Sequence, residues 1–214
     1  MRSVAPIADR SASKSARTRQ RIVDAAAAAF RRHGYASVTL KDIATRAGLQ
    51  AGSLYYHFDS KEDLIDAILS AGVDAAITAT RDAVEALGPG ADPVARLRAA
   101  IAAHVRVVLS EESHASANLR ILGQLPDAIR ERHLKQQRAY GAFWAALLRD
   151  AARAGAIRDD LDLSVVRMLT LGALNWTTEW YRAGRCSPSE VAAHAATMIL
   201  DGIVRGASPR RRRG

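Results

Sequence analysis

The sequence is poor in several residue types that common classes of protein require. It has one cysteine, Cys186, in 214 residues, which excludes an internal disulfide and argues against a cysteine metal site. Aromatic residues make up 5% of the chain, so the core must be mainly aliphatic. No apolar run reaches the ~18 residues of a membrane-spanning helix, and the N-terminus lacks the apolar core of a signal peptide. We therefore expect a cytoplasmic protein.

The residues that are abundant favour helices. Hydrophobic residues account for 49% of the chain, which is enough for a sizeable core, and Ala, Leu and Arg have high helix propensity. Runs of β-branched residues are few. The sequence therefore predicts an all-α fold of about nine helices.

Positive charge is concentrated at the two ends of the chain. Residues 1–60 carry ten Lys and Arg against four Asp, which is +6 of the total +9. The tail residues 210–213 are all arginine, so the middle of the chain is nearly neutral. Lys and Arg contacts to phosphate supply affinity for DNA through counterion release but carry no sequence information.

The stretch 39–64, TLKDIATRAGLQAGSLYYHFDSKEDL, predicts a helix-turn-helix followed by a longer helix. Thr39 can cap the first helix, and Asp42 stands where a capping box places an acid. Gly48 allows a turn with positive φ between the helices. In the second helix, about 51–57, Leu54 and Phe58 are placed to point inward. A helix of this kind would enter the major groove of DNA.

Residues 48–58, GLQAGSLYYHF, with 60–64, SKEDL, resemble the TetR family of one-component repressors. Gln50 stands where a small polar residue is common, and Ser53 where threonine is usual. The resemblance implies an operator-binding surface, for which Ser53, Tyr55, Tyr56 and His57 are candidates for base or backbone contact. Tyr55 could instead pack against the first helix. The full candidate DNA-binding set is Thr39, Lys41, Gln50, Ala51, Gly52, Ser53, Tyr55, Tyr56, His57 and Lys61, of which Thr39, Lys41 and Lys61 should position phosphates.

Periodicity and breakers predict four segments. These are a disordered basic arm (1–16), a DNA-binding domain (17–62), a ligand-binding and dimerisation domain (63–206) and a basic disordered tail (207–214). The expected helices run over about 18–33, 39–47, 51–57, 60–87, 93–108, 127–154, 163–182 and 188–205, with a short one around 114–125. Gly34, Gly88-Pro89-Gly90 and Gly155 mark helix ends.

The last two predicted helices have unusually little polar surface. Met168, Leu169 and Leu171 surround much of the helix over 163–182, and Met198 lies on the apolar stripe of its neighbour. A helix with little polar face is either enclosed or shared with a partner molecule. We therefore expect a homodimer that meets through these two helices.

Part of the C-terminal region, Asn175-Trp176 with Trp180-Tyr181 and Gly184-Arg185, resembles a branch of TetR repressors that respond to acyl-CoA thioesters. Cys186 departs from the leucine often found there. The candidate effector-binding residues are His104, Arg120, Tyr140, Trp144, Asn175, Trp176 and Trp180, with Arg167 and Arg182 as further candidates for an anionic group. His104 could also be an ordinary hydrogen-bonded core residue, and Trp176 and Trp180 could be packing residues. We expect no cofactor and no metal site.

These features predict a homodimeric repressor that a small-molecule effector, such as an acyl-CoA thioester, releases from a palindromic operator. Two alternatives stay open: regulation of an efflux system by a drug-like ligand, and DNA binding without any effector. An enzyme is not expected, because no glycine-rich phosphate loop and no nucleophile-base constellation is present.

Overall fold

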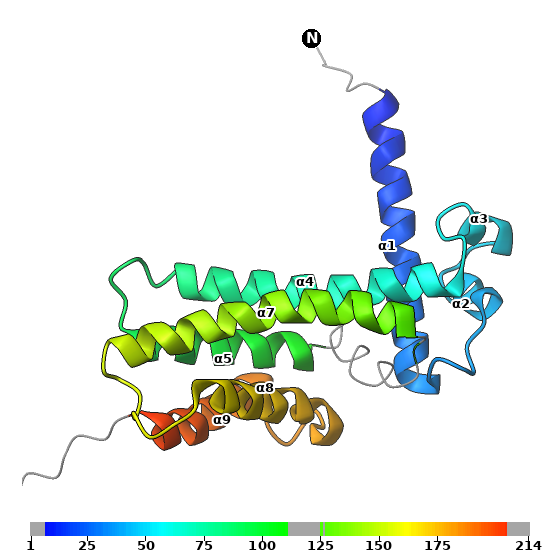
Figure 1. Cartoon of the computed structure of the whole chain (residues 1–214). Helices are drawn as coiled ribbons and strands as arrows, with labels where there is room; N and C mark the ends of the chain where they lie inside the picture. Colours follow the sequence, from blue (N-terminus) through cyan, green and yellow to red (C-terminus); the bar gives the residue numbers. More distant parts are fainter. Residues whose placement is uncertain (1–6, 111–124, 126, 205–214) are drawn as a thin grey trace, which may run out of the picture. The chain divides into compact units, whose positions relative to one another are not determined.

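The computed structural model describes residues 7–110, 125 and 127–204, and these form helices joined by short connections (Figure 1). The helices are α1 (Ile7–His33), α2 (Leu40–Arg46), α3 (Ala51–Tyr55), α4 (Lys61–Glu85), α5 (Pro93–Leu109), α7 (Asp127–Arg153), α8 (Leu163–Trp180) and α9 (Pro188–Ile203). The described residues contain no strand, and Ile157 and Val204 form an isolated antiparallel bridge. The all-α prediction is therefore confirmed. The short helix expected around 114–125 falls almost wholly on residues outside the described ranges.

The chain divides into two compact units. One comprises Met1–Gly72 and His114–Leu134, and the other Val73–Ser113 and Lys135–Gly214. Both α4 and α7 contribute residues to each unit.

In the first unit, local capping fixes the helix-turn-helix as the sequence predicts. Thr39 accepts a hydrogen bond from the Asp42 backbone N–H at 3.2 Å, while the Asp42 carboxylate accepts from the Thr39 backbone N–H at 3.0 Å. Gly48 has φ of 65°, the left-handed region that glycine enters without steric cost. These contacts set where α2 begins and ends.

The first helix starts earlier than predicted. α1 begins at Ile7, whereas apolar periodicity placed its start near Thr18. The extra turns contain Ala, Arg and Lys, which have high helix propensity, but no apolar stripe that would mark a helix. The expectation of a disordered arm over 1–16 is therefore wrong for residues 7–16.

The core of the first unit forms where α1 to α4 meet. Phe30, Ile43, Leu54, Leu64 and Ile65 are each at most 1% exposed. The same cluster includes Ile22, Val23, Ala26, Ala27, Ala29, Val38, Ala44, Ala47, Phe58, Ile68, Leu69, Leu125 and Ile129. Burying one such aliphatic side chain contributes roughly 1.5–3 kcal/mol. α3 is therefore held in place by packing, since it is too short to be stable alone.

In the second unit, α5 packs against α8 and α9. Asp92 caps α5 by accepting from the Ala95 N–H at 3.0 Å, and Ser187 forms a capping box with Glu190 at the start of α9. Both helices begin where the sequence predicted them, at residues 93 and 188, and each has proline in its first turn. Leu97, Ile101, His104, Val105 and Val108 form the buried side of α5.

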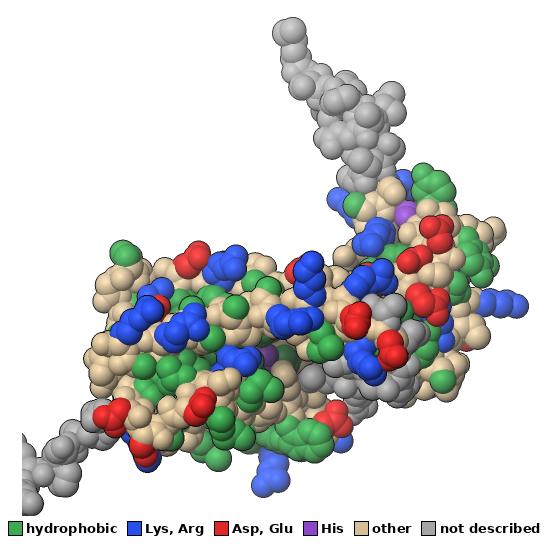
Figure 2. Space-filling view, viewed as in Figure 1, with side chains coloured by type: hydrophobic (Ala, Val, Ile, Leu, Met, Phe, Trp, Pro, Cys, Tyr) green, Lys and Arg blue, Asp and Glu red, His purple; other side chains and the backbone are tan. Residues whose placement is uncertain are grey.

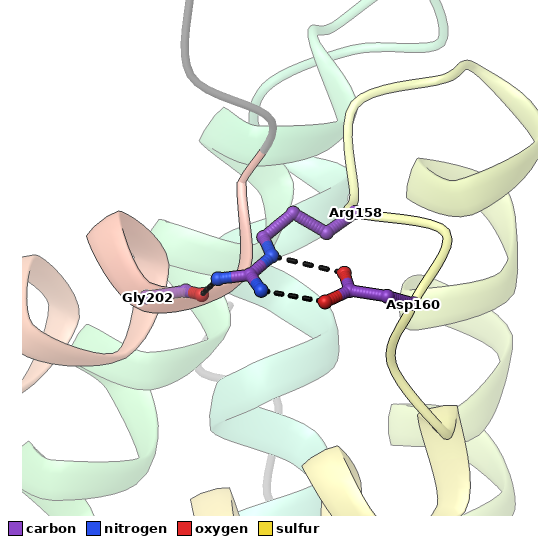
Figure 3. A network of polar contacts seen from close by, with 3 residues as sticks. All are labelled: Arg158, Asp160 and Gly202. Carbon is purple, nitrogen blue, oxygen red and sulfur yellow. Dashed lines mark hydrogen bonds and ion pairs between the residues drawn. The ribbon is translucent and has the colours of Figure 1, made fainter.

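A polar cluster ties the end of α9 to the connection between α7 and α8 (Figure 3). The Arg158 guanidinium donates to both Asp160 carboxylate oxygens, at 3.0 and 2.6 Å, and to the Gly202 carbonyl at 3.4 Å. The Arg158 backbone N–H donates to the Ile203 carbonyl at 2.9 Å. Arg158 therefore satisfies carbonyls that the last turn of α9 leaves open.

Candidate nucleic-acid interface and effector site

The recognition helix α3 is anchored on one side and open on the other. Leu54 is fully buried and Phe58 is 4% exposed, whereas Tyr56 is 82% and Tyr55 54% exposed. The guanidinium of Arg19 lies 4.8 Å from the centre of the Phe58 ring and supports it from α1. The apolar anchors thus leave both tyrosines on the surface.

α3 ends at Tyr55, two residues before the predicted end of the helix, and the other DNA-binding residues predicted for that segment lie in it or directly beside it. Gln50, Ala51, Gly52 and Ser53 are exposed, and the His57 ring meets the Tyr56 ring edge-on at 5.2 Å. No heavy atom outside the neighbouring backbone lies within 4 Å of where a Cβ on Gly52 would be, and its φ is not positive. Neither packing within the described chain nor backbone conformation therefore requires glycine there.

The three residues predicted to contact phosphates differ in whether their side chains already have hydrogen-bond partners within the protein. Lys41 is exposed. The Thr39 hydroxyl donates to the Asp42 carboxylate at 2.6 Å, and this bond lowers the pKa of Asp42. Lys61 Nζ donates to the backbone carbonyl of Tyr35 at 2.5 Å, and burial lowers the pKa of Lys61. The Lys61 ammonium is thus engaged within the protein.

Other arginines of the basic N-terminal region have structural contacts that sequence reasoning missed. Arg21 donates to the Ala47 carbonyl at 2.6 Å and closes the C-terminus of α2. Arg46 lies 3.2 Å from His33 Nε2. Arg31, Arg32, Arg46 and Ala28 line an open hollow of about 480 Å³. Contacts that span 13 and 26 residues leave no periodic signal in the sequence.

In the second unit, the structure brings four of the predicted effector residues together. His104 of α5 lies 2.8 Å from the Tyr140 hydroxyl through Nδ1 and 3.0 Å from Asn175 Oδ1 through Nε2. The His104 ring stacks on Tyr140 at 5.8 Å and meets Trp144 edge-on at 6.0 Å. The result is a buried polar cluster that joins α5, α7 and α8.

Thr80 of α4 extends this cluster, and sequence reasoning missed it. Its Oγ1 lies 3.0 Å from the Tyr140 hydroxyl and also contacts the Ala76 carbonyl. Thr80 is fully buried. A polar residue between Ile77 and Val84 on an apolar face was the available signal. We call His104, Tyr140, Asn175 and Thr80 the polar relay.

Burial controls the protonation of the polar relay. It lowers the pKa of His104 to about 4 and raises the pKa of Tyr140. His104 is therefore neutral at pH 7, with one ring nitrogen donating and the other accepting. With Nε2–H donating to the Asn175 carbonyl oxygen, Nδ1 accepts from the Tyr140 hydroxyl. This tautomer is assigned from the partners.

Trp176 and Trp180 do not join the polar relay. They are 66% and 54% exposed, on the same helix as exposed Val165, Met168 and Leu169. Met198 of α9 is 79% exposed. Figure 2 shows hydrophobic side chains gathered over α8 and α9. We call Val165, Met168, Leu169, Trp176, Trp180 and Met198 the apolar face.

Two of the three candidate arginines for an anionic group can be placed, and they make different contacts. Arg120 lies outside the described residues. Arg182 Nη1 donates to the Tyr181 and Glu179 carbonyls at 2.7 and 3.2 Å, closing the end of α8. A Cβ on Gly141 would come within 2.8 Å of Arg167 Nη1, so the Arg167 side chain lies against α7.

In the described part of the chain, no helix has the combination of length and apolar character that crossing a bilayer requires. Among the same described residues, no His, Cys, Asp and Glu side chains gather in threes as a metal ion would need.

Comparison with known families assigns both halves of the chain. Residues 22–68 match the family described as bacterial regulatory proteins, tetR family. Residues 90–203 match the tetracyclin repressor-like C-terminal domain. The first match contains the helix-turn-helix, and the second contains His104, Tyr140 and Asn175 of the polar relay.

Individual proteins are similar over nearly the whole length. The HTH-type transcriptional repressor KstR2 of Rhodococcus jostii is 32% identical over 211 residues, covering 92% of this chain and 96% of the relative. The structure of the ketosteroid transcriptional regulator KstR2 of Mycobacterium tuberculosis has a TM-score of 0.77 at 26% identity, covering 88% and 95%. AibR in complex with isovaleryl coenzyme A and operator DNA has a TM-score of 0.74 at 26% identity, covering 85% and 98%.

These similarities confirm the predicted family, which consists of transcriptional regulators rather than enzymes. The chain belongs to the TetR family of DNA-binding transcriptional regulators.

Proposed function

We propose that this regulator is a cytoplasmic homodimeric repressor, released from a palindromic operator by a small-molecule effector of the acyl-CoA thioester class. The observation that carries the proposal is α3, whose apolar anchors Leu54 and Phe58 leave Tyr55 and Tyr56 exposed. It occurs in a chain that is similar over nearly its whole length to a transcriptional repressor.

The DNA-binding surface is the open face of α3 with the start of α2. Tyr55, Tyr56, His57, Ser53 and Gln50 read or line the major groove, where base edges carry sequence information. Thr39 and Lys41 position the phosphate backbone. The small residues Ala51 and Gly52 allow the start of α3 to approach the DNA closely.

The apolar face of α8 and α9 is the dimer interface in this proposal. It presents two tryptophans and four large aliphatic side chains to solvent, and a patch of this kind marks an interaction surface. Contact with the same face of a second copy buries it and gives a twofold dimer. Twofold symmetry then matches two recognition helices to a palindromic operator.

The polar relay and the aromatic residues around it form the effector site. Breaking the bond to His104 Nδ1 frees the Tyr140 hydroxyl to donate to a thioester carbonyl. The aliphatic helices around them suit an acyl chain, and Trp144 offers an aromatic face. Support for the acyl-CoA class comes from AibR, a structural relative seen with isovaleryl coenzyme A and operator DNA.

Regulation follows from a shift between two states of the dimer. An effector weakens operator binding only to the extent that it binds the released state more tightly than the DNA-bound state. A tenfold change in operator affinity needs about 1.4 kcal/mol of this difference.

Footprinting tests the proposal in two steps. The purified protein is first mapped on the DNA upstream of its own gene, where a protected palindrome is expected. Isovaleryl-CoA, longer acyl-CoA thioesters, free coenzyme A and cationic drug-like compounds are then added separately. Release by a thioester but not by free coenzyme A supports the proposal. Release by the cationic compounds alone favours an efflux regulator, and no release by any of them favours a factor without an effector.

A further inference from the structure

The first turn of α4 grips Tyr35 through two consecutive side chains. Lys61 Nζ donates to the Tyr35 backbone carbonyl at 2.5 Å, and the Tyr35 hydroxyl donates to Glu62 Oε1 at 2.9 Å. Tyr35 lies in the connection from α1 to α2, and all three residues belong to the first unit. We call Tyr35, Lys61 and Glu62 the Tyr35 clasp.

Aromatic rings complete the clasp. Lys61 Nζ lies 4.1 Å from the centre of the Tyr35 ring and 5.7 Å from that of Phe30, within the range of a cation–π interaction. Phe30 is 1% exposed, and its ring lies 6.1 Å from that of Tyr35. The clasp is therefore anchored to the core that also holds the recognition helix.

This geometry differs from that of a lysine whose only task is to meet phosphate. Such a lysine is a solvated point charge on a flexible stem, whereas Lys61 has one N–H bonded to a carbonyl and its charge placed against a ring. Exposed Lys41 fits the phosphate role better. The contacts of Lys61 instead join α4 to the segment that leads into the helix-turn-helix.

We propose that Tyr35, Lys61 and Glu62 are positioning residues for operator recognition. The clasp fixes the start of α4 against the α1–α2 connection, and so fixes the angle at which α3 presents Tyr55 and Tyr56 to the groove. This inference rests on the DNA-reading function proposed above. It predicts that loss of the clasp lowers binding to the operator more than binding to random DNA.

A pair of acid-to-alanine variants separates positioning from charge. Glu62→Ala and Asp63→Ala each remove one negative charge from the first turn of α4, but the clasp contact belongs to Glu62. Asp63 is exposed, and its backbone N–H donates to Ser60 Oγ at 3.0 Å in both cases. Removal of one negative charge raises the affinity for every DNA sequence, and it does so equally in the two variants.

The measurement is the ratio of affinities for the footprinted operator and for a random duplex of equal length. Glu62→Ala should lower this ratio roughly tenfold relative to Asp63→Ala, the loss typical of one misaligned base contact. If the two variants have equal ratios while the wild type prefers the operator, the proposed role of the Tyr35 clasp is overturned. A wild type that binds both duplexes equally contradicts the DNA-reading function itself.

A double-mutant cycle on Tyr35 and Lys61 adds an independent measurement, because the substitution of Tyr35 does not change the charge of the protein. Tyr35→Leu should lower the ratio roughly tenfold, and adding Lys61→Met to it should lower the ratio no further, because both remove the same contact. If Lys61 only met phosphate, Tyr35→Leu would leave the ratio unchanged and Lys61→Met would reduce the salt slope by about 0.9. That result overturns the proposal. If Tyr35→Leu does not fold, the comparison of Glu62→Ala with Asp63→Ala tests the proposal alone.

Discussion

Acid should destabilise this protein through His104 in the polar relay. The pKa of His104 falls from 6.5 to about 4 on folding because the ring is buried, so the unfolded chain binds a proton more readily than the folded protein. The stability that neutral His104 maintains is complete above pH 6.5 and is lost as the pH falls towards 4. Between pH 8 and pH 5 the loss is about 2 kcal/mol.

His104→Gln isolates this contribution. Glutamine keeps a donor and an acceptor near Tyr140 and Asn175 but does not titrate. The free energy of unfolding should therefore fall about 2 kcal/mol less in the variant than in the wild type between pH 8 and pH 5. The other titrating groups, including buried His133, whose pKa burial also lowers, are common to both proteins and cancel in the difference.

Urea unfolding followed by circular dichroism, at one protomer concentration and several pH values, supplies these free energies. Calorimetric unfolding in buffers of different ionisation enthalpy counts the protons taken up. Near pH 5, the wild type should take up close to one proton more than His104→Gln. Parallel curves for the two proteins would refute a buried neutral His104.

Three further substitutions test other parts of the structure. Tyr140→Phe should lower the free energy of unfolding by about 2 kcal/mol, because it leaves buried His104 Nδ1 and Thr80 Oγ1 without their shared partner. A loss below about 0.5 kcal/mol in urea unfolding would contradict the polar relay. Gly52→Ala should keep or raise thermal stability, by up to about 1 kcal/mol, yet weaken operator binding; unchanged operator affinity would argue against close approach at Gly52. Leu169→Asp should convert dimers to monomers in sedimentation velocity, since it places charge on the apolar face; a dimer that persists would place the interface elsewhere.

Local features were predictable because the sequence alone determines them. The cap Thr39 acts on a backbone N–H three residues away, and Gly48 meets a backbone requirement of its own turn. The buried faces of α1 and α5 follow from helical spacing. The same spacing brought His104 forward as a candidate, because it interrupts an apolar stripe, whereas Asn175 came from the resemblance to the acyl-CoA-responsive branch.

Contacts set by tertiary packing were not predictable. Arg21 and Lys61 both appeared as available positive charge, yet each donates to a backbone carbonyl 26 residues away. Thr80 gained its role from Tyr140, 60 residues later. The early start of α1 was missed for a different reason, since no apolar periodicity marks the first turns of that helix.

Tyr56→Ala is the most direct test of the claim that α3 reads DNA. Tyr56 is 82% exposed and contributes little to the core, so the variant should keep its thermal stability and its dimer. We expect operator affinity in fluorescence anisotropy to fall by roughly 1–3 kcal/mol, as for loss of one base contact, while affinity for a random duplex is unchanged. Unchanged operator affinity in the folded variant would contradict the account.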